Sequence, residues 1–422
     1  MLIEFSVANF RSFWEPQKFS MTATPKKDLR ENNIFQSTVP GLPLLLRSAV
    51  VYGPNAGGKS NLIRAMGFMR HFVLSSAKEY QEGESIAVKP FLFNDFGATQ
   101  PSEFEVNFIQ DGVRYQYGFA ATSDRVTNEW LIAYPGGRSQ RWFERTFQQE
   151  KGGYKWYFGS RFTGHKKQWQ GMTRSNALFL STAIQWNSEQ LRPVFTWFQN
   201  LLVIEHGMLL DPVFSMQECL DDAKKKLILT FMNEADISIS DIRMETKEFS
   251  AEDLPNDMPP PVREEVRQKM DGKKMVRIGF LHPLPEMDAP VPLPLEEESD
   301  GTRKLFAYAG PWLDILARGR ILLVDELDTS LHPKIVRFLL GMFHNAKTNP
   351  KNAQLIFTTH DTSLLDQEIM RRDQIWFIEK NRANASHLYP LSDFKPRVGE
   401  ALQKGYLNGR YGALPYIKEA RP

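Results

Sequence analysis

Gly53-Pro54-Asn55-Ala56-Gly57-Gly58-Lys59-Ser60 is a complete G-x-x-x-x-G-K-S sequence, the pattern of a phosphate-binding loop. Glycines in such a loop let consecutive backbone N–H groups turn toward a phosphate. In this pattern the lysine, here Lys59, contacts the β- and γ-phosphate oxygens, and the hydroxyl of the serine, here Ser60, ligates a bound Mg²⁺. We therefore expect these residues, together with Asn61, to contact the phosphates of a bound nucleotide.

The flanking sequence favours a real loop over a chance match. Residues 48–52 are apolar and typical of a short buried strand, and residues 61–66 have the pattern of a helix start. A helix that starts at the loop directs its N-terminal N–H groups toward the phosphates. The odds of a chance match in a chain of 422 residues are about one in a hundred. The sequence thus predicts that the chain binds a nucleoside triphosphate.

A second motif lies at residues 320–326, which read Arg-Ile-Leu-Leu-Val-Asp-Glu. On its own, such a segment is more often an ordinary core strand whose end is acidic. In a chain with a phosphate-binding loop it is the expected Walker B strand, in which Asp325 holds the Mg²⁺ that Ser60 also ligates. Glu326 is then placed to orient and deprotonate the attacking water, which is the role of a catalytic base.

The segments after this strand carry a family resemblance. Residues 327–333 read Leu-Asp-Thr-Ser-Leu-His-Pro, and residues 354–361 are another apolar segment that ends in Thr-Thr-His-Asp. With the loop and the Asp-Glu strand, their order resembles the ABC-type ATPases, including the SMC and OLD-like groups. The resemblance implies that ATP is the nucleotide, that Asp328 communicates across a dimer interface, and that His360 contacts the γ-phosphate in catalysis.

ABC-type ATPases also carry a signature sequence that covers the nucleotide of the opposite subunit. The candidate here is Ser299-Asp300-Gly301-Thr302, which departs from the usual L-S-G-G-Q at Glu298, Asp300 and Thr302. At the start of a helix, the hydroxyl of Ser299 and the N–H of Gly301 would face a γ-phosphate. Because a bare S-x-G pattern also arises by chance, the assignment depends on its position just before the Asp-Glu strand.

The first strand carries a further resemblance. Residues 2–13, Leu-Ile-Glu-Phe-Ser-Val-Ala-Asn-Phe-Arg-Ser-Phe, are similar to the opening strand and turn of SMC, RecF and OLD-like ATPases. The resemblance places Arg11 near the nucleotide phosphates, and a surface arginine in an edge turn is an equal alternative. Gln185 is a candidate for the Q-loop glutamine of these families.

Composition restricts the compartment and the partners. The net charge of +2, with 24% charged residues, demands no nucleic-acid partner. Cys219 is the only cysteine, which excludes an internal disulfide and agrees with a reducing compartment. Residues 1–7 alternate like a strand and do not form a signal peptide, and no apolar run reaches the ~18 residues of a membrane span. We expect a soluble cytoplasmic protein with no membrane partner.

The spacing of the motifs predicts an ATPase domain that is interrupted by a long insertion. The expected segments are the N-terminal part of the ATPase domain at 1–75, an inserted β-rich lobe at 76–180, a helical insertion with Pro-rich loops at 181–295, and the C-terminal part of the ATPase domain at 296–422.

Sequence patterns support the two kinds of structure within the insertion. Residues 104–108 and 114–119 alternate like strands around an Asp-Gly hairpin signal. Their aromatic side chains are more often cross-strand packing groups than base-stacking groups. Residues 216–233 have a helical apolar stripe, and residues 253–261 and 287–294 are Pro-rich breaks. Two short basic clusters, at 165–167 and 224–226, are solvated surface or, alternatively, contacts to a phosphate backbone.

The C-terminal tail narrows the resemblance. Residues 405–415, Gly-Tyr-Leu-Asn-Gly-Arg-Tyr-Gly-Ala-Leu-Pro, resemble the tail of the AAA_15/AAA_21 ATPases of AbiL/RloA type. These are related to OLD-family proteins and to the ATPase subunits of the Septu and PARIS anti-phage systems. The resemblance covers essentially the full chain. It implies an α/β fold, an ABC/SMC-like P-loop ATPase head with a mixed sheet plus an inserted antiparallel β and helical lobe. It also implies a separately encoded effector, such as a Toprim-type nuclease.

Two functions remain open. The first is an ATP-hydrolysing switch of antiviral defence that dimerises around ATP and controls an effector. The second is a DNA-binding SMC/RecF-like repair or maintenance ATPase. The near-neutral charge, the tail and the lack of coiled-coil heptads favour the first, whereas salt-dependent DNA binding tighter than ~micromolar would favour the second. Because one loop leaves the γ-phosphate uncovered, a homodimer or higher oligomer is expected.

Overall fold

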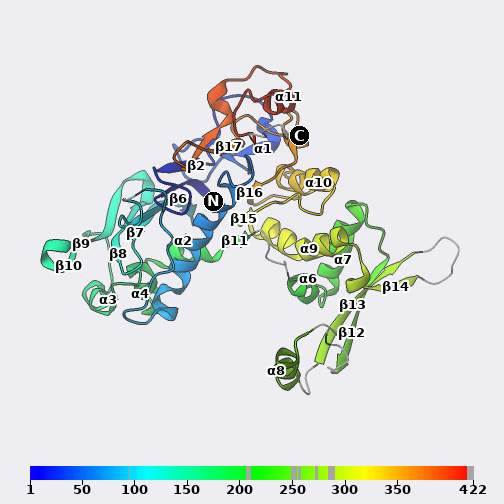
Figure 1. Ribbon diagram of the computed structural model, residues 1–422, viewed down its shortest axis with the longest axis horizontal. Coiled ribbons are helices and arrows are strands. Elements are labelled where there is room, and N and C mark those ends of the chain that lie inside the picture. The colour runs from blue at the N-terminus through cyan, green and yellow to red at the C-terminus, as the bar shows by residue number, and fades with distance from the viewer. Residues whose placement is uncertain are drawn as a thin grey trace, which may run out of the picture. The chain divides into compact units, whose positions relative to one another are not determined.

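A computed structural model describes residues 1–94, 96–205, 211–248, 254, 258–270, 274–283 and 290–415 (Figure 1). The chain divides into two compact units. The first unit comprises Met1–Met208, Ile315–Thr329 and Val336–Pro422, and the second comprises Leu209–Asp314 and Ser330–Ile335.

The first unit contains a six-stranded mixed sheet with the order β11-β15-β16-β5-β17-β18. Its strands are β5 (Ser48–Tyr52), β11 (Leu201–Ile204), β15 (Ile321–Val324), β16 (Gln354–Thr358), β17 (Ile375–Lys380) and β18 (Ser386–Pro390). All neighbours pair in parallel except β17 and β18. Parallel strands are buried on both faces, which explains the continuous apolar runs in the sequence. The carboxyl ends of β5, β15 and β16 therefore meet at one edge, and the motifs follow them there.

A seven-stranded antiparallel sheet in the same unit has the order β10-β9-β8-β7-β6-β1-β2. Its strands are β1 (Leu2–Ala8), β2 (Gln17–Ser20), β6 (Ser102–Gln110), β7 (Val113–Ala121), β8 (Val126–Tyr134), β9 (Gln140–Gln148) and β10 (Gly153–Phe158). The predicted hairpin is confirmed, with positive φ at Asp111 (50°) and Gly112 (73°), as a type I′ turn requires. Because β1 pairs with β6, the β-rich segment continues the sheet that begins at the N-terminus.

The long helix α2 (Lys59–Glu79) joins both sheets into one core. Leu62 and Met66 lie in the same buried cluster as Val51 of the central sheet. Farther along the helix, the Phe72 ring lies 5.4 Å from that of Phe119 on β7. This packing fixes the start of α2, where the phosphate-binding loop ends.

The helices complete the first unit. They are α1 (Arg30–Asn33), α3 (Lys166–Met172), α4 (Phe179–Gln185), α5 (Arg192–Gln199) and α11 (Leu402–Leu407), with short 3-10 turns and the two-residue strands β3 (Ile34–Phe35) and β4 (Leu45–Leu46). The segment boundaries expected at 75/76 and 180/181 fall inside α2 and α4, and the expected division of the chain into four segments stays a prediction.

The second unit contains helices and a three-stranded antiparallel sheet, β12-β13-β14. Its elements are α6 (Val213–Glu218), α7 (Asp222–Glu234), β12 (Asp241–Glu248), α8 (Pro260–Met270), β13 (Lys274–His282) and β14 (Val291–Pro294). Two helices continue into the first unit, α9 (Asp300–Arg318) and α10 (Pro333–His344). The sheet was not expected, because strand pairing across some thirty residues leaves little local signal.

Two local expectations in this unit are corrected. The helical pattern expected at 216–233 is confirmed but is divided between α6 and α7, because Asp221 accepts the N–H of Lys224 at 3.0 Å and so caps a new helix. The break expected at 287–294 is wrong at its end, where β14 pairs with β13, and residues 287–289 lie outside the described residues. Among the helices that the structure describes, none has the length and apolar character to cross a bilayer.

Candidate nucleotide-binding site

The phosphate-binding loop joins β5 to α2, which confirms the predicted strand–loop–helix order. Its glycines are also required by close contact with β17 and β18. A Cβ at Gly53 would lie 2.2 Å from the carbonyl oxygen of Ile378, and a Cβ at Gly58 would lie 2.4 Å from the hydroxyl oxygen of Ser386. Gly58 also has φ +122°, a conformation that residues with side chains rarely adopt. The loop backbone is thus held against two strands of the central sheet.

A buried hydrogen-bond network supports the loop. The Ser386 hydroxyl lies 2.7 Å from the Gly57 carbonyl oxygen and 2.8 Å from the Ser12 hydroxyl. The Ser12 hydroxyl also accepts from the side-chain amide of Asn61 at 2.8 Å. The amide of Asn61, expected to contact the nucleotide, is therefore engaged with the turn after β1. Asn55 and Ala56 are exposed at the tip of the loop, and Pro54 is partly buried.

The ammonium group of Lys59 lies at the electrostatic centre of the site. The residue is 5% exposed, and its Nζ donates to the Gly53 carbonyl oxygen at 2.8 Å. Burial lowers the pKa of Lys59, and the carboxylates of Glu326, Asp325 and Asp328 oppose that shift. The structure thus brings together the charged residues that were predicted from two distant motifs.

Thr358, at the end of β16, organises the two carboxylates that follow β15. Its hydroxyl donates to Asp325 Oδ1 at 2.7 Å and accepts the backbone N–H of Glu326 at 2.7 Å. Glu326 has φ 53°, in the left-handed region. A residue with a side chain is strained there by about 1–3 kcal/mol, and such strain is concentrated at functional sites. Thr358 therefore fixes the direction of both acidic residues.

The residues at this edge fit a bound Mg²⁺. Asp325 is 4% exposed, and its Oδ2 is buried without a hydrogen-bond partner among the described residues. An unpartnered buried carboxylate oxygen is costly and suits a metal ligand. Mg²⁺ usually takes one or two carboxylates together with substrate phosphates. No three His, Cys, Asp or Glu side chains gather as a metal site in the part of the chain that the structure describes. Ser60, in the first turn of α2, is the second predicted ligand.

Asp328 and His360 meet at the same edge of the sheet. The Asp328 carboxylate accepts the backbone N–H of His360 at 3.2 and 3.4 Å, and the imidazole is exposed. Tyr52 at the end of β5 lies beside them, and its hydroxyl donates to the Asp361 carbonyl oxygen at 2.8 Å. Burial, and then the carboxylates of Asp361 and Asp328, raise the pKa of Tyr52. The predicted roles of Asp328 across a dimer interface and of His360 at the γ-phosphate stay predictions.

Arg11 is partly buried beside α2, in the turn after β1. Burial lowers its pKa, the charge of Arg64 lowers it further, and Glu205 opposes the shift. The Nε atom of Arg11 is buried without a hydrogen-bond partner among the described residues. Arg64 lies on α2, with its Nε 3.5 Å from Glu205 Oε2. These residues form a charged cluster beside α2, and the predicted contact of Arg11 with the nucleotide phosphates stays a prediction.

Glu205 was missed in the sequence. It directly follows β11, in which Ile204 is paired with Val324 of β15. The N–H of Asp325 donates to the Ile204 carbonyl at 2.9 Å, so Glu205 and Asp325 end neighbouring strands. The signal was present, since Leu-Leu-Val-Ile-Glu at 201–205 is an apolar segment that ends in a carboxylate. Ser12 and Ser386 carried no comparable signal.

In the second unit, Ser299 has a structural partner. Its hydroxyl accepts the backbone N–H of Thr302 at 3.1 Å and so caps the start of α9. A Cβ at Gly301 would lie 3.0 Å from the carbonyl oxygen of Ser330. Helix capping explains the serine without a nucleotide, and its role in covering a γ-phosphate stays a prediction.

Gln185 is exposed at the last turn of α4. In the preceding turn, the Ser181 hydroxyl donates to the Val73 carbonyl oxygen at 2.6 Å. Val73 lies about four turns along α2 from Lys59. The structure therefore does not bring this candidate to the phosphate-binding loop.

Known proteins resemble the chain in sequence and in fold. The family described as "AAA domain, putative AbiEii toxin, Type IV TA system" matches residues 48–167 and 241–366. No curated protein matches the sequence. Among solved structures, the SMC head domain from Thermotoga maritima is similar at a TM-score of 0.42 and 13% identity, covering 92% of this chain and 98% of that one. The recombination mediator RecF with ATP is similar at a TM-score of 0.36 and 13% identity, covering 86% and 94%.

The family match spans more than half of the chain and includes both motifs of the site. It begins at β5, continues through the loop and α2, and resumes in a segment that contains β15, β16 and His360. These are the elements that bring Lys59, Asp325 and Glu326 together. The chain is therefore a member of the AAA_21 family of P-loop ATPase domains, as the resemblance of its motifs and tail indicated.

Proposed function

We propose that the chain is an ABC-like ATPase subunit that binds and hydrolyses ATP with Mg²⁺, dimerises around the nucleotide, and controls a separate effector in anti-phage defence. One observation carries the ATPase assignment. The buried ammonium group of Lys59 interacts electrostatically with the carboxylates of Glu326, Asp325 and Asp328. Phosphoryl transfer requires this combination of a phosphate-binding cation, a metal-binding carboxylate and a residue that orients water.

The geometry supports a separate role for each of these residues in ATP hydrolysis. The loop N–H groups and Lys59 bind the β- and γ-phosphates, and Ser60 and Asp325 hold Mg²⁺, which neutralises phosphate charge when bound. Glu326, held by Thr358, accepts a proton from the attacking water. His360 contacts the γ-phosphate from the end of β16.

Replacing Lys59 with Ala is expected to weaken ATP binding about 10- to 100-fold, because a charge-assisted contact to the triphosphate is lost. Isothermal titration calorimetry with Mg²⁺ and ATP measures the effect. Lys78→Ala is the matched control, since Lys78 is exposed in the last turn of the same helix. If the two variants bind ATP with equal affinity, Lys59 does not hold the phosphates.

The oligomeric part of the proposal is a homodimer with two shared sites. In each site, Ser299 and Gly301 of one subunit cover the nucleotide held by Lys59 of the other, and Asp328 lies in the interface. One loop per chain makes a two-fold arrangement the simplest closed assembly. The position of Ser299 at the N-terminus of α9 supports this assignment, because the partial positive charge there suits a phosphate.

Mixing two inactive variants tests the shared site. Lys59→Ala and Ser299→Arg are each expected to lack ATPase activity. A mixed dimer retains one intact site, so the mixture is expected to recover about a quarter of the wild-type activity if subunits exchange at random. Mixed dimers that form, as shown by two affinity tags, but remain inactive would contradict the shared-site arrangement.

Effector control is favoured over DNA binding because the basic clusters are engaged within the chain. Lys224 lies 2.8 Å from Glu218, and Lys225 lies 2.6 Å from Asp241. Lys166 donates to the carbonyl oxygen of Phe162 at 2.6 Å. Two lysines of the cluster at 224–226 thus have an acidic partner within the chain, and the near-neutral net charge adds no strong attraction to a phosphate backbone.

Reconstitution separates the two functions. The product of the neighbouring reading frame, purified with this chain, is expected to show an effector activity that depends on ATP and that neither protein has alone. DNA binding by this chain alone, tighter than ~micromolar at physiological salt and steeply salt-dependent, would support the repair or maintenance function instead.

A further inference from the structure

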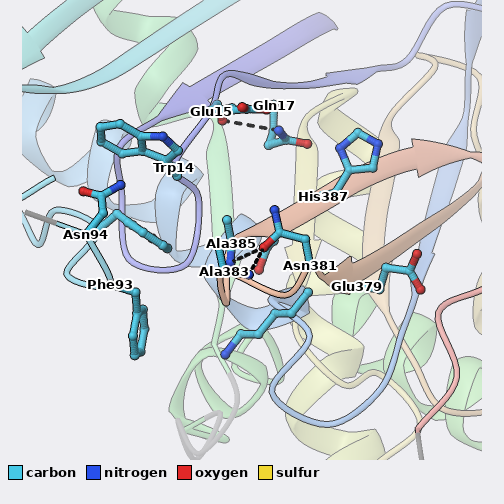
Figure 2. Close-up of a pocket in the computed structure, with 13 residues that line it drawn as sticks. Trp14, Glu15, Gln17, Phe93, Asn94, Glu379, Asn381, Ala383, Ala385 and His387 are labelled. Atoms are coloured by element: carbon cyan, nitrogen blue, oxygen red, sulfur yellow. Dashed lines mark hydrogen bonds between the residues drawn. The ribbon is translucent and has the colours of Figure 1, made fainter. Parts of the chain in front are cut away.

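A cavity of about 390 Å³ lies beside the phosphate-binding loop in the first unit (Figure 2). It is lined by the turn after β1, by the segment that contains Phe91 and Phe93, and by the turn between β17 and β18. Ser386 lines the cavity, and its hydroxyl also lies 2.7 Å from the Gly57 carbonyl oxygen of the loop. One residue thus borders both the cavity and the loop.

We propose that this cavity holds the nucleobase of the nucleotide whose phosphates the loop binds. The inference rests on the proposed binding of ATP and adds the part of the site that would recognise the nucleoside. A volume of about 390 Å³ is in the range of small-molecule sites.

The aromatic side chains supply a stacking surface. The ring of Trp14 lies 5.9 Å from that of the buried Phe91, which in turn lies 5.6 Å from the ring of Phe93. Phe93 is 62% exposed, which is unusual for a phenylalanine in a structured segment. Figure 2 shows Trp14 and Phe93 on one side of the cavity and the turn with Asn381 and Ala383 on the other. A planar base between them would cover aromatic surface that is otherwise in water.

Buried hydrogen bonds hold the walls of the cavity in place. The Asn9 side chain, in a residue 4% exposed, accepts the N–H of Phe91 at 3.1 Å and donates to the Gly97 carbonyl at 2.9 Å. On the opposite wall, the Gln17 side chain accepts the N–H of Leu388 on β18 at 2.8 Å. The N–H of Ser386 also donates to the Ser12 carbonyl oxygen at 2.7 Å, so the lining segments are tied to the turn after β1 and the cavity is a built feature of the fold.

The same turn connects the cavity to the phosphate end of the site. The Ser12 hydroxyl accepts from the side chain of Asn61, in the first turn of α2, and Trp14 follows Ser12 closely in the chain. Polar groups are also available at the cavity for the edge of a base or for a ribose. Glu15 is exposed there, and the Lys380 ammonium lies 6.0 Å from the centroid of the Phe93 ring.

A comparison of ATP with inorganic tripolyphosphate tests the proposal, because the two share phosphates and differ in the nucleoside. Calorimetric titrations with Mg²⁺ are expected to show that the wild-type chain binds ATP more tightly. Trp14→Ala and Phe93→Ala are each expected to lower ATP affinity by about 5- to 100-fold, the range for loss of one base-stacking contact, and to leave tripolyphosphate affinity unchanged. Trp186→Ala is the matched control, since Trp186 is 51% exposed and does not line the cavity.

The other outcomes overturn the inference in distinguishable ways. If both variants bind ATP as the wild type does, no base stacks on these rings. If each variant loses affinity for ATP and tripolyphosphate equally, the rings only support the loop. A wild-type chain that binds the two ligands equally keeps the proposed phosphate site and rules out the base site, whereas one that binds neither also removes the proposed function. Phe93→Ala keeps the test decisive if Trp14→Ala does not fold, because Phe93 is largely exposed.

Discussion

Replacing Glu326 with Gln is expected to lower ATP turnover about 10²- to 10⁴-fold while ATP still binds. Gln keeps the shape of the side chain and removes the group that accepts a proton from water. The backbone should not change, because its φ of 53° is held by the hydrogen bond from the Glu326 N–H to the Thr358 hydroxyl at 2.7 Å. Phosphate release measures turnover, and titration calorimetry measures ATP affinity.

Two results bear on the role of Glu326. The matched control is Glu368→Gln, an exposed glutamate in the same unit, which is expected to retain full turnover. Unchanged turnover in Glu326→Gln would remove this carboxylate from the mechanism. A loss of ATP affinity as large as the loss of turnover would instead assign Glu326 to nucleotide binding.

Glu129→Gln is expected to destabilise the first unit by about 3–5 kcal/mol, the usual effect of breaking a buried ion pair from one side. Glu129 and Arg145 are both fully buried, with the Arg145 Nε 3.0 Å from Glu129 Oε2. The same carboxylate accepts the backbone N–H groups of Phe179 and Leu180 at 2.7 and 3.0 Å, which caps the start of α4. The substitution leaves Arg145 charged and without a carboxylate partner in the core.

Urea unfolding followed by circular dichroism measures this effect. Glu144→Gln is the control, because the Arg141–Glu144 pair at 2.7 Å is exposed and such pairs contribute about 0–1 kcal/mol. Equal, small changes in the two variants would show that the buried pair contributes no more than a surface pair. Glu129 lies on β8 and contacts the start of α4, and α4 meets α2 at Val73, about four turns from Lys59. ATP affinity of the folded Glu129→Gln variant is therefore expected to remain at the wild-type value.

Local sequence patterns were sufficient to predict an element where the residues that determine it lie within one short segment. The phosphate-binding loop, β5 and β15 were identified correctly because a parallel strand is a continuous apolar run and the loop has a fixed spacing. The hairpin at Asp111-Gly112 was identified because its turn requires positive φ at both positions.

Patterns failed where a structural partner lies elsewhere in the chain. The helix expected at 216–233 is interrupted because the side chain of Asp221 caps α7, and an apolar stripe does not reveal such a cap. The strands of the second unit were missed because β12 and β13 gain their stability from each other. Glu205 was overlooked because its meaning depends on the pairing of β11 with β15.

By itself, the sequence determined the nucleotide-binding motifs, the α/β class and the family of this protein, because each is encoded in residues that are close together or in a fixed order. Only the tertiary structure decided what surrounds those motifs. The Ser386 hydroxyl meets the Ser12 hydroxyl across 374 positions of sequence, and the carbonyl of Ile378 leaves no room for a Cβ at Gly53. The physical reason is that such contacts arise when strands from distant parts of the chain pair in one sheet, and a local pattern specifies that a strand forms but not which strand lies beside it.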